Sequence, residues 1–173
     1  IENRVERKSM NAGDRRKIIR DFSAGIIVLC IVYTFLTIIR DLRDNFMANI
    51  WTELGYANDY TVFARSETWI SFWLLLMMGS LVLIRKNIYA FRVIHLLIIS
   101  GFLLALLSSA LFFAGQMPGS WWMQAVGLGL YMAYIPFNAI FFDRMIATFR
   151  ISGNVGFLIY ITDAFGYLGS VSI

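Results

Sequence analysis

The densest group of ionisable side chains in the sequence stands at the end of an apolar run, in the segment Arg40-Asp-Leu-Arg-Asp-Asn45. Apolar residues continue beyond it at a spacing of four, which predicts a helix that does not stop at Arg40. On that helix Arg40, Asp41, Asp44 and Asn45 cover a polar arc of roughly 140°. On a cavity wall these groups could bind a substrate or a coupling ion. On a helix that has left the bilayer they would form a solvated ion-pair face, and the sequence leaves both interpretations open.

Two further ionisable residues need a partner if they lie inside a membrane. Arg43 falls on the apolar side of the same helix, so it must snorkel or find a partner on another helix. Asp163 lies ten residues into a later apolar run, about 15 Å from its boundary. A carboxyl at this depth costs about 2.5–3.5 kcal/mol, so it carries a proton or pairs with a cation. Asp163 is therefore a candidate proton-coupling group, with a lock between helices as the alternative.

Asn138 stands two residues after Pro136 in the segment Tyr134-Ile-Pro-Phe-Asn138. A proline inside a helix frees a backbone carbonyl one turn earlier and predicts a kink. The amide of Asn138 could satisfy that carbonyl or bind a ligand. Asp143 and Arg144, a few residues later, are expected at the membrane interface.

The composition places these residues in a membrane protein. Of the 173 residues 59% are hydrophobic and only 15% are charged, against about 45–50% and about 25% in soluble domains. This excludes a disordered chain, a disulfide-stapled secreted domain and a soluble nucleic-acid binder. With one cysteine, Cys30, and one histidine, His95, the chain has no Cys/His metal cluster, and we expect no cofactor. Zinc-protease, phosphate-loop and nucleophile-elbow motifs are absent from the sequence, so we expect no enzyme.

Five apolar stretches are long enough to cross a bilayer as helices. The predicted fold is an all-α, polytopic transmembrane helix bundle, preceded by a basic cytoplasmic connector at residues 1–21. The bundle covers residues 22–173, with spans at about 22–42, 69–84, 93–114, 121–142 and 153–173. The apolar run also allows the second span to start a few residues before Trp69. Small residues in Ala125-x-x-x-Gly129 and Gly166-x-x-x-Ser170 predict close helix packing.

Basic residues predict the orientation of the spans. They gather before the first span, between spans two and three and between spans four and five. This assigns the N-terminus and the 85–92 and 143–152 loops to the cytoplasm. Four tryptophans fall near the predicted outer ends, where indole rings prefer to lie: Trp51, Trp69, Trp121 and Trp122. We also expect the chain to be part of a longer protein, because it begins at Ile1 without an initiator Met and stops as the fifth span ends.

Several strings of residues resemble the C-terminal half of a major facilitator superfamily transporter from a bacterial branch. The strings are Arg40-Asp-Leu-Arg-Asp-Asn-Phe46, Gly79-Ser-Leu-Val-Leu-Ile-Arg-Lys86, Tyr134-Ile-Pro-Phe-Asn138, Phe142-Asp-Arg144 and the glycine-rich Gly156–Gly169. In the turn after the second span, Ile84 stands near the position where the family has an acid.

The resemblance implies two six-helix halves that rock around a central site by alternating access. The first span here would line the cavity, with Arg40, Asp41, Arg43, Asp44, Asn45, Asn138 and Asp163 as substrate or ion ligands. Gating or cytoplasmic-loop roles would fall to Arg85, Lys86, Asp143 and Arg144. The expected partners are the lipid bilayer, a small polar solute, and either the N-terminal half of the same chain or another membrane protein. An arginine that faces the cavity favours an anionic or zwitterionic solute by charge complementarity. The alternative is a non-transport subunit or scaffold of the inner membrane, with the charged arc as a docking surface.

Overall fold

The computed structural model describes residues 11–59, 61–149 and 155–172, which are helical apart from short turns. No strand occurs among the described residues, so the predicted all-α fold class is confirmed. The helices in chain order are α1 (Ala12–Asp21), α2 (Ser23–Asn45), α3 (Met47–Trp51), the π-helical turn η1 (Thr52–Tyr56), α4 (Val62–Val82), α5 (Asn87–Phe113), α6 (Gly119–Pro136), the π-helical turn η2 (Phe137–Phe141), α7 (Phe142–Phe149) and α8 (Val155–Val171).

Three helical stretches are long and apolar enough to cross a membrane, which indicates a membrane protein. They are Ser23–Asn45, Asn87–Phe113 and Gly119–Phe149, the last formed by α6, η2 and α7 without a break. The other two predicted spans also correspond to helices, with different bounds. α4 begins seven residues before the predicted start at Trp69 and so includes Arg65 and Glu67, and α8 has 17 residues.

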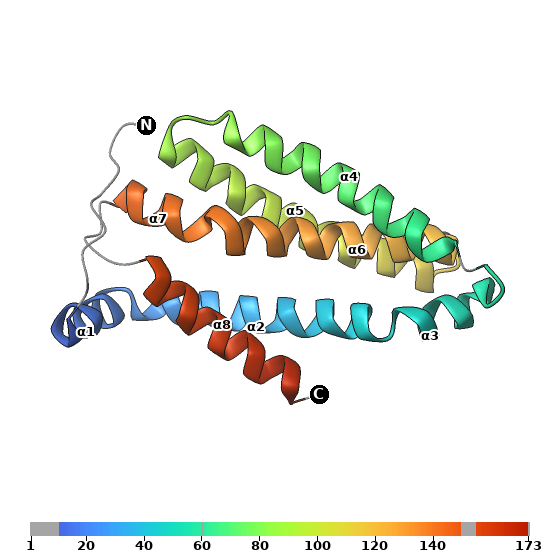
Figure 1. Ribbon diagram of the computed structural model, residues 1–173, viewed down its shortest axis with the longest axis horizontal. Helices are drawn as coiled ribbons and strands as arrows, with labels where there is room; N and C mark the ends of the chain where they lie inside the picture. Colours follow the sequence, from blue (N-terminus) through green and yellow to red (C-terminus); the bar gives the residue numbers. More distant parts are fainter. Residues whose placement is uncertain (1–10, 60, 150–154, 173) are drawn as a thin grey trace.

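The long helices lie roughly along one axis (Figure 1). α5 and α4 pack against α6, while α8 crosses α2 at an angle on the other side of the molecule. α3 and the first turns of α4 and α6 lie together at one end, which we call the tryptophan end because it carries Trp51, Trp69, Trp121 and Trp122. α1 and the starts of α5 and α8 lie at the opposite end.

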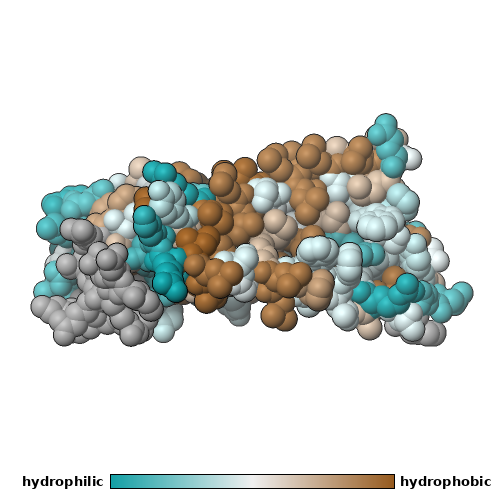
Figure 2. Space-filling view, turned by 90° about the horizontal axis from the view of Figure 1, so that it is seen from above, coloured by the Kyte–Doolittle hydropathy of each residue, from teal (hydrophilic) through white to brown (hydrophobic). Residues whose placement is uncertain are grey.

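The surface is apolar around the middle and polar toward both ends. Figure 2 shows hydrophobic residues gathered over the central part of the visible face, with hydrophilic residues on either side. Large apolar side chains are well exposed on several helices, among them Phe35, Leu75 and Leu106 at 60%, 74% and 65%. Such a band suits lipid contact, because lipid tails replace the protein core as the apolar environment.

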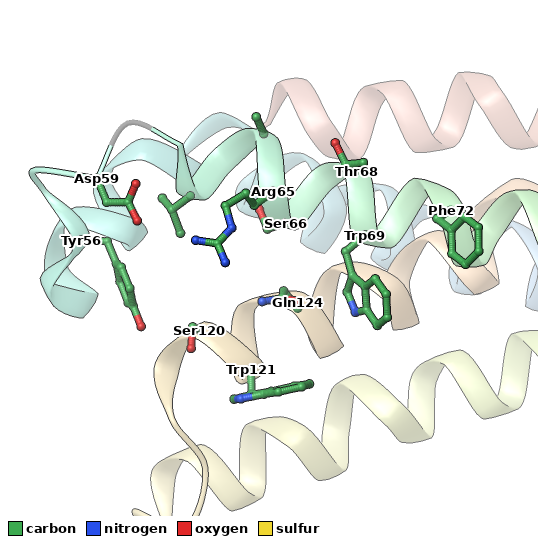
Figure 3. A pocket seen from close by; sticks show the side chains of 12 residues that line it. Tyr56, Asp59, Arg65, Ser66, Thr68, Trp69, Phe72, Ser120, Trp121 and Gln124 are labelled. Carbon is green, nitrogen blue, oxygen red and sulfur yellow. The ribbon is translucent and has the colours of Figure 1, made fainter.

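A groove of about 980 Å³ lies at the tryptophan end, between the first turns of α4 and α6 (Figure 3). It is lined by polar and aromatic side chains from η1, the η1–α4 turn, α4 and α6. None of the residues predicted as site residues from the sequence lines this groove.

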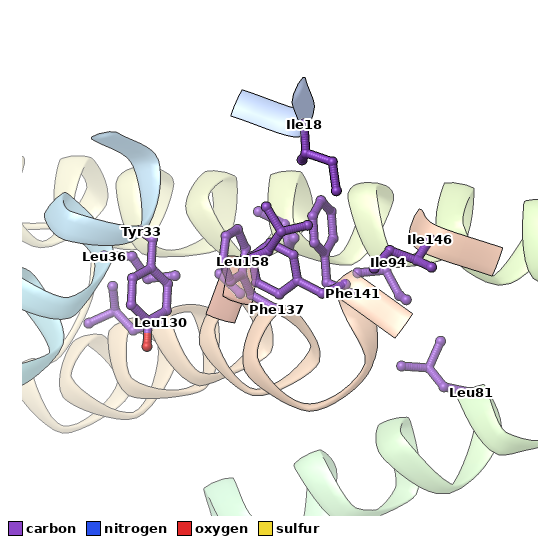
Figure 4. Packing of buried hydrophobic residues seen from close by; sticks show 13 residues of the cluster. Ile18, Tyr33, Leu36, Leu81, Ile94, Leu130, Phe137, Phe141, Ile146 and Leu158 are labelled. Atoms are coloured by element: carbon purple, nitrogen blue, oxygen red, sulfur yellow. The ribbon is translucent and has the colours of Figure 1, made fainter. Parts of the chain in front are cut away.

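The core is aromatic and aliphatic and is centred on the second half of α6 and on η2 (Figure 4). Phe137 and Phe141 stack with ring centroids 4.9 Å apart, and Leu36 of α2 and Ile94 of α5 are fully buried in the same cluster. α5 and α6 cross at glycines: a Cβ added at Gly129 would lie 2.5 Å from the carbonyl oxygen of Gly101. The predicted close packing at Gly129 is thus confirmed, and Cys30 is buried.

The predicted connector is described from residue 11 onward, where α1 starts with a capping box between Asn11 and Asp14. Of the basic residues used to predict orientation, Arg4, Arg7, Lys8 and Arg150 lie outside the described residues.

Candidate functional site

Polar side chains line the face of α2 that points into the protein. α2 continues to Asn45, as predicted from the spacing of its apolar residues. Its residues Tyr33, Thr37 and Arg43 are buried, whereas Phe35, Ile39 and Leu42 are exposed. We use the name polar ladder for a set of polar residues on α2 and their partners on other helices. The α2 members are Tyr33, Arg40, Asp41, Arg43 and Asp44, and the partners are Glu67, Tyr131, Tyr134, Asn138, Asp163 and Ser170.

The first level of the ladder joins three helical segments through one tyrosine. Asn138 of η2 donates from Nδ2 to the Tyr33 hydroxyl oxygen at 3.1 Å. The same hydroxyl donates to Oδ1 of Asp163 on α8 at 2.8 Å. Tyr33 is only 3% exposed, and its ring stacks on Phe137 with centroids 5.0 Å apart. The carboxyl of Asp163 therefore meets a neutral donor that is itself held rigidly by packing.

Close packing of α8 on α2 makes this first level possible. A Cβ added at Gly166 would lie 2.7 Å from the ring of Tyr33, and one at Gly169 would lie 2.5 Å from the methyl group of Thr34. The absence of a side chain at both glycines lets the two helices approach one another. This confirms the close packing predicted from Gly166-x-x-x-Ser170.

The second level lies about two turns further along α2. The Arg40 guanidinium pairs with the Asp41 carboxylate, with Nε 3.0 Å from Oδ1. It also lies over the ring of Tyr134 on α6, with Cζ 4.0 Å from the centroid, within cation–π range. The other oxygen of Asp41 accepts a hydrogen bond from Ser170 on α8. This level thus connects α2 to α6 and α8.

The third level contains the most buried charge of the ladder. Arg43 is 4% exposed and donates from Nη1 to Asp44 at 2.9 Å and from Nη2 to Glu67 of α4 at 2.7 Å. Tyr131 of α6 donates to the second oxygen of Asp44 at 2.7 Å. A Cβ added at Gly127 would lie 2.5 Å from Nη2 of Arg43, so the guanidinium occupies the space that this glycine leaves free.

The pairing of residues along the ladder fixes the relative direction of the helices. Tyr33 contacts Asp163 and Asp41 contacts Ser170, so α2 and α8 run in the same direction. On α6 the order is reversed, because Arg40 contacts Tyr134 and the more C-terminal Asp44 contacts Tyr131.

The charges of the ladder do not balance. Four carboxyls face two guanidiniums: Asp41, Asp44, Glu67 and Asp163 against Arg40 and Arg43. Both guanidiniums are engaged by the first three acids. Within the described residues Asp163 has no cation within 4 Å, and its hydrogen-bond partner is the Tyr33 hydroxyl.

The comparison with protein families covers the whole chain. A family model described as a family of unknown function, DUF5690, matches residues 1–173. The chain belongs to this family. No curated protein and no solved structure matches it.

In this DUF5690 chain the ladder brings together part of the set of residues that the sequence singled out. It includes Arg40, Asp41, Arg43, Asp44, Asn138 and Asp163. Asn45 is exposed and lies outside the ladder. The residues proposed for gating lie elsewhere: Arg85, Lys86 and Asp143 are exposed, and Arg144 of α7 donates to Asn87 at the start of α5 at 2.7 Å.

Two details differ from the predicted polar arc. The arc included Asn45 and left Arg43 outside it, whereas Arg43 is the buried member of the cluster. Of the two outcomes expected for Arg43, a partner on another helix is the one observed. In addition, Arg40 and Arg43 each pair with the next residue along α2, Asp41 and Asp44 respectively.

Pro136 and Asn138 also act differently from the simplest expectation. The helix changes from α to π geometry directly after Pro136, over Phe137–Phe141, and then continues as α7. A π-helical turn is wider than an α turn and often marks a functional site. The Asn138 amide donates to the Tyr33 hydroxyl on another helix, and binding of a ligand by Asn138 stays a prediction.

Five members of the ladder were missed by sequence reasoning. These are Tyr33, Glu67, Tyr131, Tyr134 and Ser170. Tyr131 and Tyr134 stand three residues apart on one face of α6, a spacing that could have pointed to a polar face. Glu67 lay just before the predicted start of the second span and was therefore counted as a loop residue.

Proposed function

We propose that this chain forms one half of a secondary active transporter resembling the major facilitator superfamily. It would move a small polar solute, with anions favoured, across the bacterial inner membrane by alternating access. The observation that carries the proposal is Asp163: a half-buried carboxyl without a cationic neighbour among the described residues, hydrogen-bonded to a buried tyrosine in an apolar bundle. Ionisable residues inside membrane helices most often serve transport or proton relay.

The proposal includes five membrane crossings with the N-terminal side in the cytoplasm. The parallel arrangement of α2 and α8 and the antiparallel arrangement of α2 and α6 support a path that alternates in direction. The basic residues near α1 and before α5 support this orientation, because cytoplasmic segments are enriched in Lys and Arg.

Within this proposal each level of the ladder has a role. Asp163 would exchange the coupling proton, with Tyr33 and Asn138 as its hydrogen-bonded neighbours. Arg40, half-buried on the face of Tyr134, would recognise the anion in exchange for part of its contact with Asp41. Arg43 is already shared between two carboxylates, so its role would be to hold α2, α4 and α6 together.

The first test replaces the proposed coupling carboxyl. We expect Asp163→Asn to abolish proton-driven uptake while solute counterflow, which needs no net proton movement, continues. The natural full-length protein would be reconstituted in liposomes and screened with carboxylates, amino acids, sugars and sugar phosphates. Glu53→Gln, an exposed carboxyl in η1, is the matched control and should leave uptake unchanged. Proton-driven uptake that survives Asp163→Asn removes Asp163 from the mechanism.

The second test concerns the proposed anion site. Arg40→Lys keeps the positive charge but loses the planar guanidinium, so uptake of an anionic solute should fall about tenfold, the effect of one lost charge-assisted hydrogen bond. Arg92→Lys, an exposed arginine on α5, is the control. Size-exclusion chromatography should give the same profile for both variants, which separates loss of transport from loss of assembly. Unchanged uptake in Arg40→Lys would argue against anion recognition by this residue.

A non-transport membrane subunit is the second candidate, and one observation favours it. Arg40, Arg43 and Asp163 each have a hydrogen-bond or ion-pair partner within the chain, as residues that lock helices together would. On this reading neither substitution affects a transport activity. Both would instead weaken association with a partner membrane protein, which co-purification from the native membrane would detect.

A further inference from the structure

The groove at the tryptophan end has its two charged side chains at one end, which we call the polar end, and most of its aromatic rings toward the other, which we call the aromatic end. Tyr56 lies at the polar end, and the polar side chains of Thr68 and Gln124 lie among the aromatic rings. In Figure 3 Asp59, Arg65 and Ser120 lie near the turn that precedes α4, Trp69 and Phe72 lie further along α4, and Trp121 lies beside Ser120 at the start of α6. These six residues all line the same cavity. The order along the groove, from charged to aromatic, follows the order from headgroup to acyl chain in a phospholipid.

The polar end carries one charge of each sign. Asp59 accepts hydrogen bonds from the backbone N–H and the hydroxyl of Thr61, at 3.0 and 2.7 Å. These bonds hold the pKa of the Asp59 carboxyl below its usual range, and the positive charge of Arg65 adds to the effect. Asp59 therefore stays anionic at neutral pH. Arg65 is exposed and forms no ion pair within 4 Å among the residues that the structure describes.

The position of Asp59 is set by the backbone. The chain turns at Gly55, whose φ of 91° lies in the left-handed region that favours glycine. The Asp59 N–H then bonds to the Tyr56 carbonyl at 3.0 Å, and the Val62 N–H bonds to the Asp59 carbonyl at 3.3 Å. The turn thus presents a fixed carboxylate across the groove from the α6 start.

The aromatic end offers a surface for an acyl chain. Trp69 stacks on Phe72 with centroids 6.5 Å apart, both on the exposed side of α4. Trp121, in the first turn of α6, is 61% exposed and faces the same cavity. Indole rings favour the boundary between headgroups and hydrocarbon, where one side is apolar and the other is wet.

We propose that this groove binds a zwitterionic phospholipid whose headgroup carries a primary amine. Arg65 contacts the phosphodiester, Asp59 contacts the ammonium group, and one acyl chain lies along Trp69, Phe72 and Trp121. The hydroxyl of Ser120 supplies a further donor to the phosphate. The opposite charges decide the choice of headgroup, because an anionic lipid would satisfy Arg65 but leave Asp59 facing a second negative charge. This site is separate from the polar ladder and does not depend on the transport proposal.

The test compares two lipids that differ only in the headgroup. The natural full-length protein, delipidated in detergent, would be mixed with equal amounts of phosphatidylethanolamine and phosphatidylglycerol of identical acyl chains. Bound lipid would be counted by native mass spectrometry. We expect at least fivefold more phosphatidylethanolamine than phosphatidylglycerol on the wild-type protein. Equal binding of the two lipids would overturn the proposal.

Substitutions of Arg65 and Asp59 allow the roles of the two charges to be separated. Arg65→Gln should lower binding of both lipids about tenfold. Asp59→Asn keeps the acceptor for Thr61, so it should fold normally and should remove the preference between the lipids without abolishing binding. Arg92→Gln, an exposed arginine at the opposite end, should change neither quantity. A preference that persists in Asp59→Asn would contradict the proposed contact with the ammonium group.

A competition experiment distinguishes a lipid from a soluble ligand that has the same headgroup. Free O-phosphoethanolamine should compete only at concentrations far above those of the lipid, because it lacks the acyl chain that lies on the aromatic end. If it binds as tightly as phosphatidylethanolamine, the aromatic residues contribute nothing and the proposed lipid site is wrong.

Discussion

Replacement of Arg43 by alanine should lower the free energy of unfolding by about 3 kcal/mol, because it breaks a buried ion pair and leaves two carboxylates without their cation. Arg43 is 4% exposed, and its guanidinium is shared between Asp44 on its own helix and Glu67 on α4. The estimate is at the low end for a buried pair, since these two carboxylates are 30% and 34% exposed and retain some solvation. The measurement is reversible unfolding of the full protein in mixed micelles.

Three variants test the physical reason for this loss. Arg43→Lys should give an intermediate result, because one ammonium group replaces a planar fork that reaches both acids. Glu67→Gln in the Arg43→Ala background should recover part of the loss, since it removes one of the stranded charges. Arg92→Ala, on the exposed surface, should stay within about 0.5 kcal/mol of the wild type. Equal losses in Arg43→Ala and Arg92→Ala would show that the guanidinium is not a structural link between α2 and α4.

The helices of this fold can be predicted from apolar runs because a bilayer requires about 20 apolar residues for each crossing. The start of α4 could not be predicted in this way. It is set by the turn at Asp59 and Thr61, which satisfies backbone groups before the apolar part of the helix begins. As a result Glu67 belongs to α4 and can reach Arg43, a contact that no hydropathy pattern contains.

The ladder itself could be predicted only in part. The rarity of charge in apolar runs identified Arg40, Asp41, Arg43, Asp44 and Asp163, since such residues are costly without partners. Which of them is buried depends on the neighbouring helices. The face that the pattern marks as apolar, with Phe35, Ile39 and Leu42, is exposed, because the bundle keeps its polar groups inside and turns apolar ones outward.

At the crossing of α5 and α6 we expect the addition of a single methyl group to lower the stability of the protein substantially. A Cβ at Gly129 would lie 2.5 Å from the Gly101 carbonyl oxygen and 3.0 Å from the Ala105 backbone nitrogen. Backbone atoms cannot rotate away as a side chain can, so Gly129→Ala must push the two helices apart. Overpacking of this kind costs about 1–3 kcal/mol, and we expect about 2 kcal/mol here.

Gly79→Ala on α4 is the matched control for Gly129→Ala, because a Cβ there would meet nothing within 4 Å. Alanine is the better helix former by about 1 kcal/mol, so this substitution should leave stability unchanged or raise it. The two variants add the same methyl group to an apolar helix, yet we expect the free energy of unfolding to fall in Gly129→Ala and not to fall in Gly79→Ala. This difference is the outcome that tests the prediction. Unfolding of the two variants in the same micelles gives the comparison. If Gly129→Ala proves as stable as Gly79→Ala, α5 and α6 do not cross as closely as the positions of Gly101 and Gly129 imply. The placement of Tyr131 and Tyr134 of α6 against α2 would then have to be revised as well.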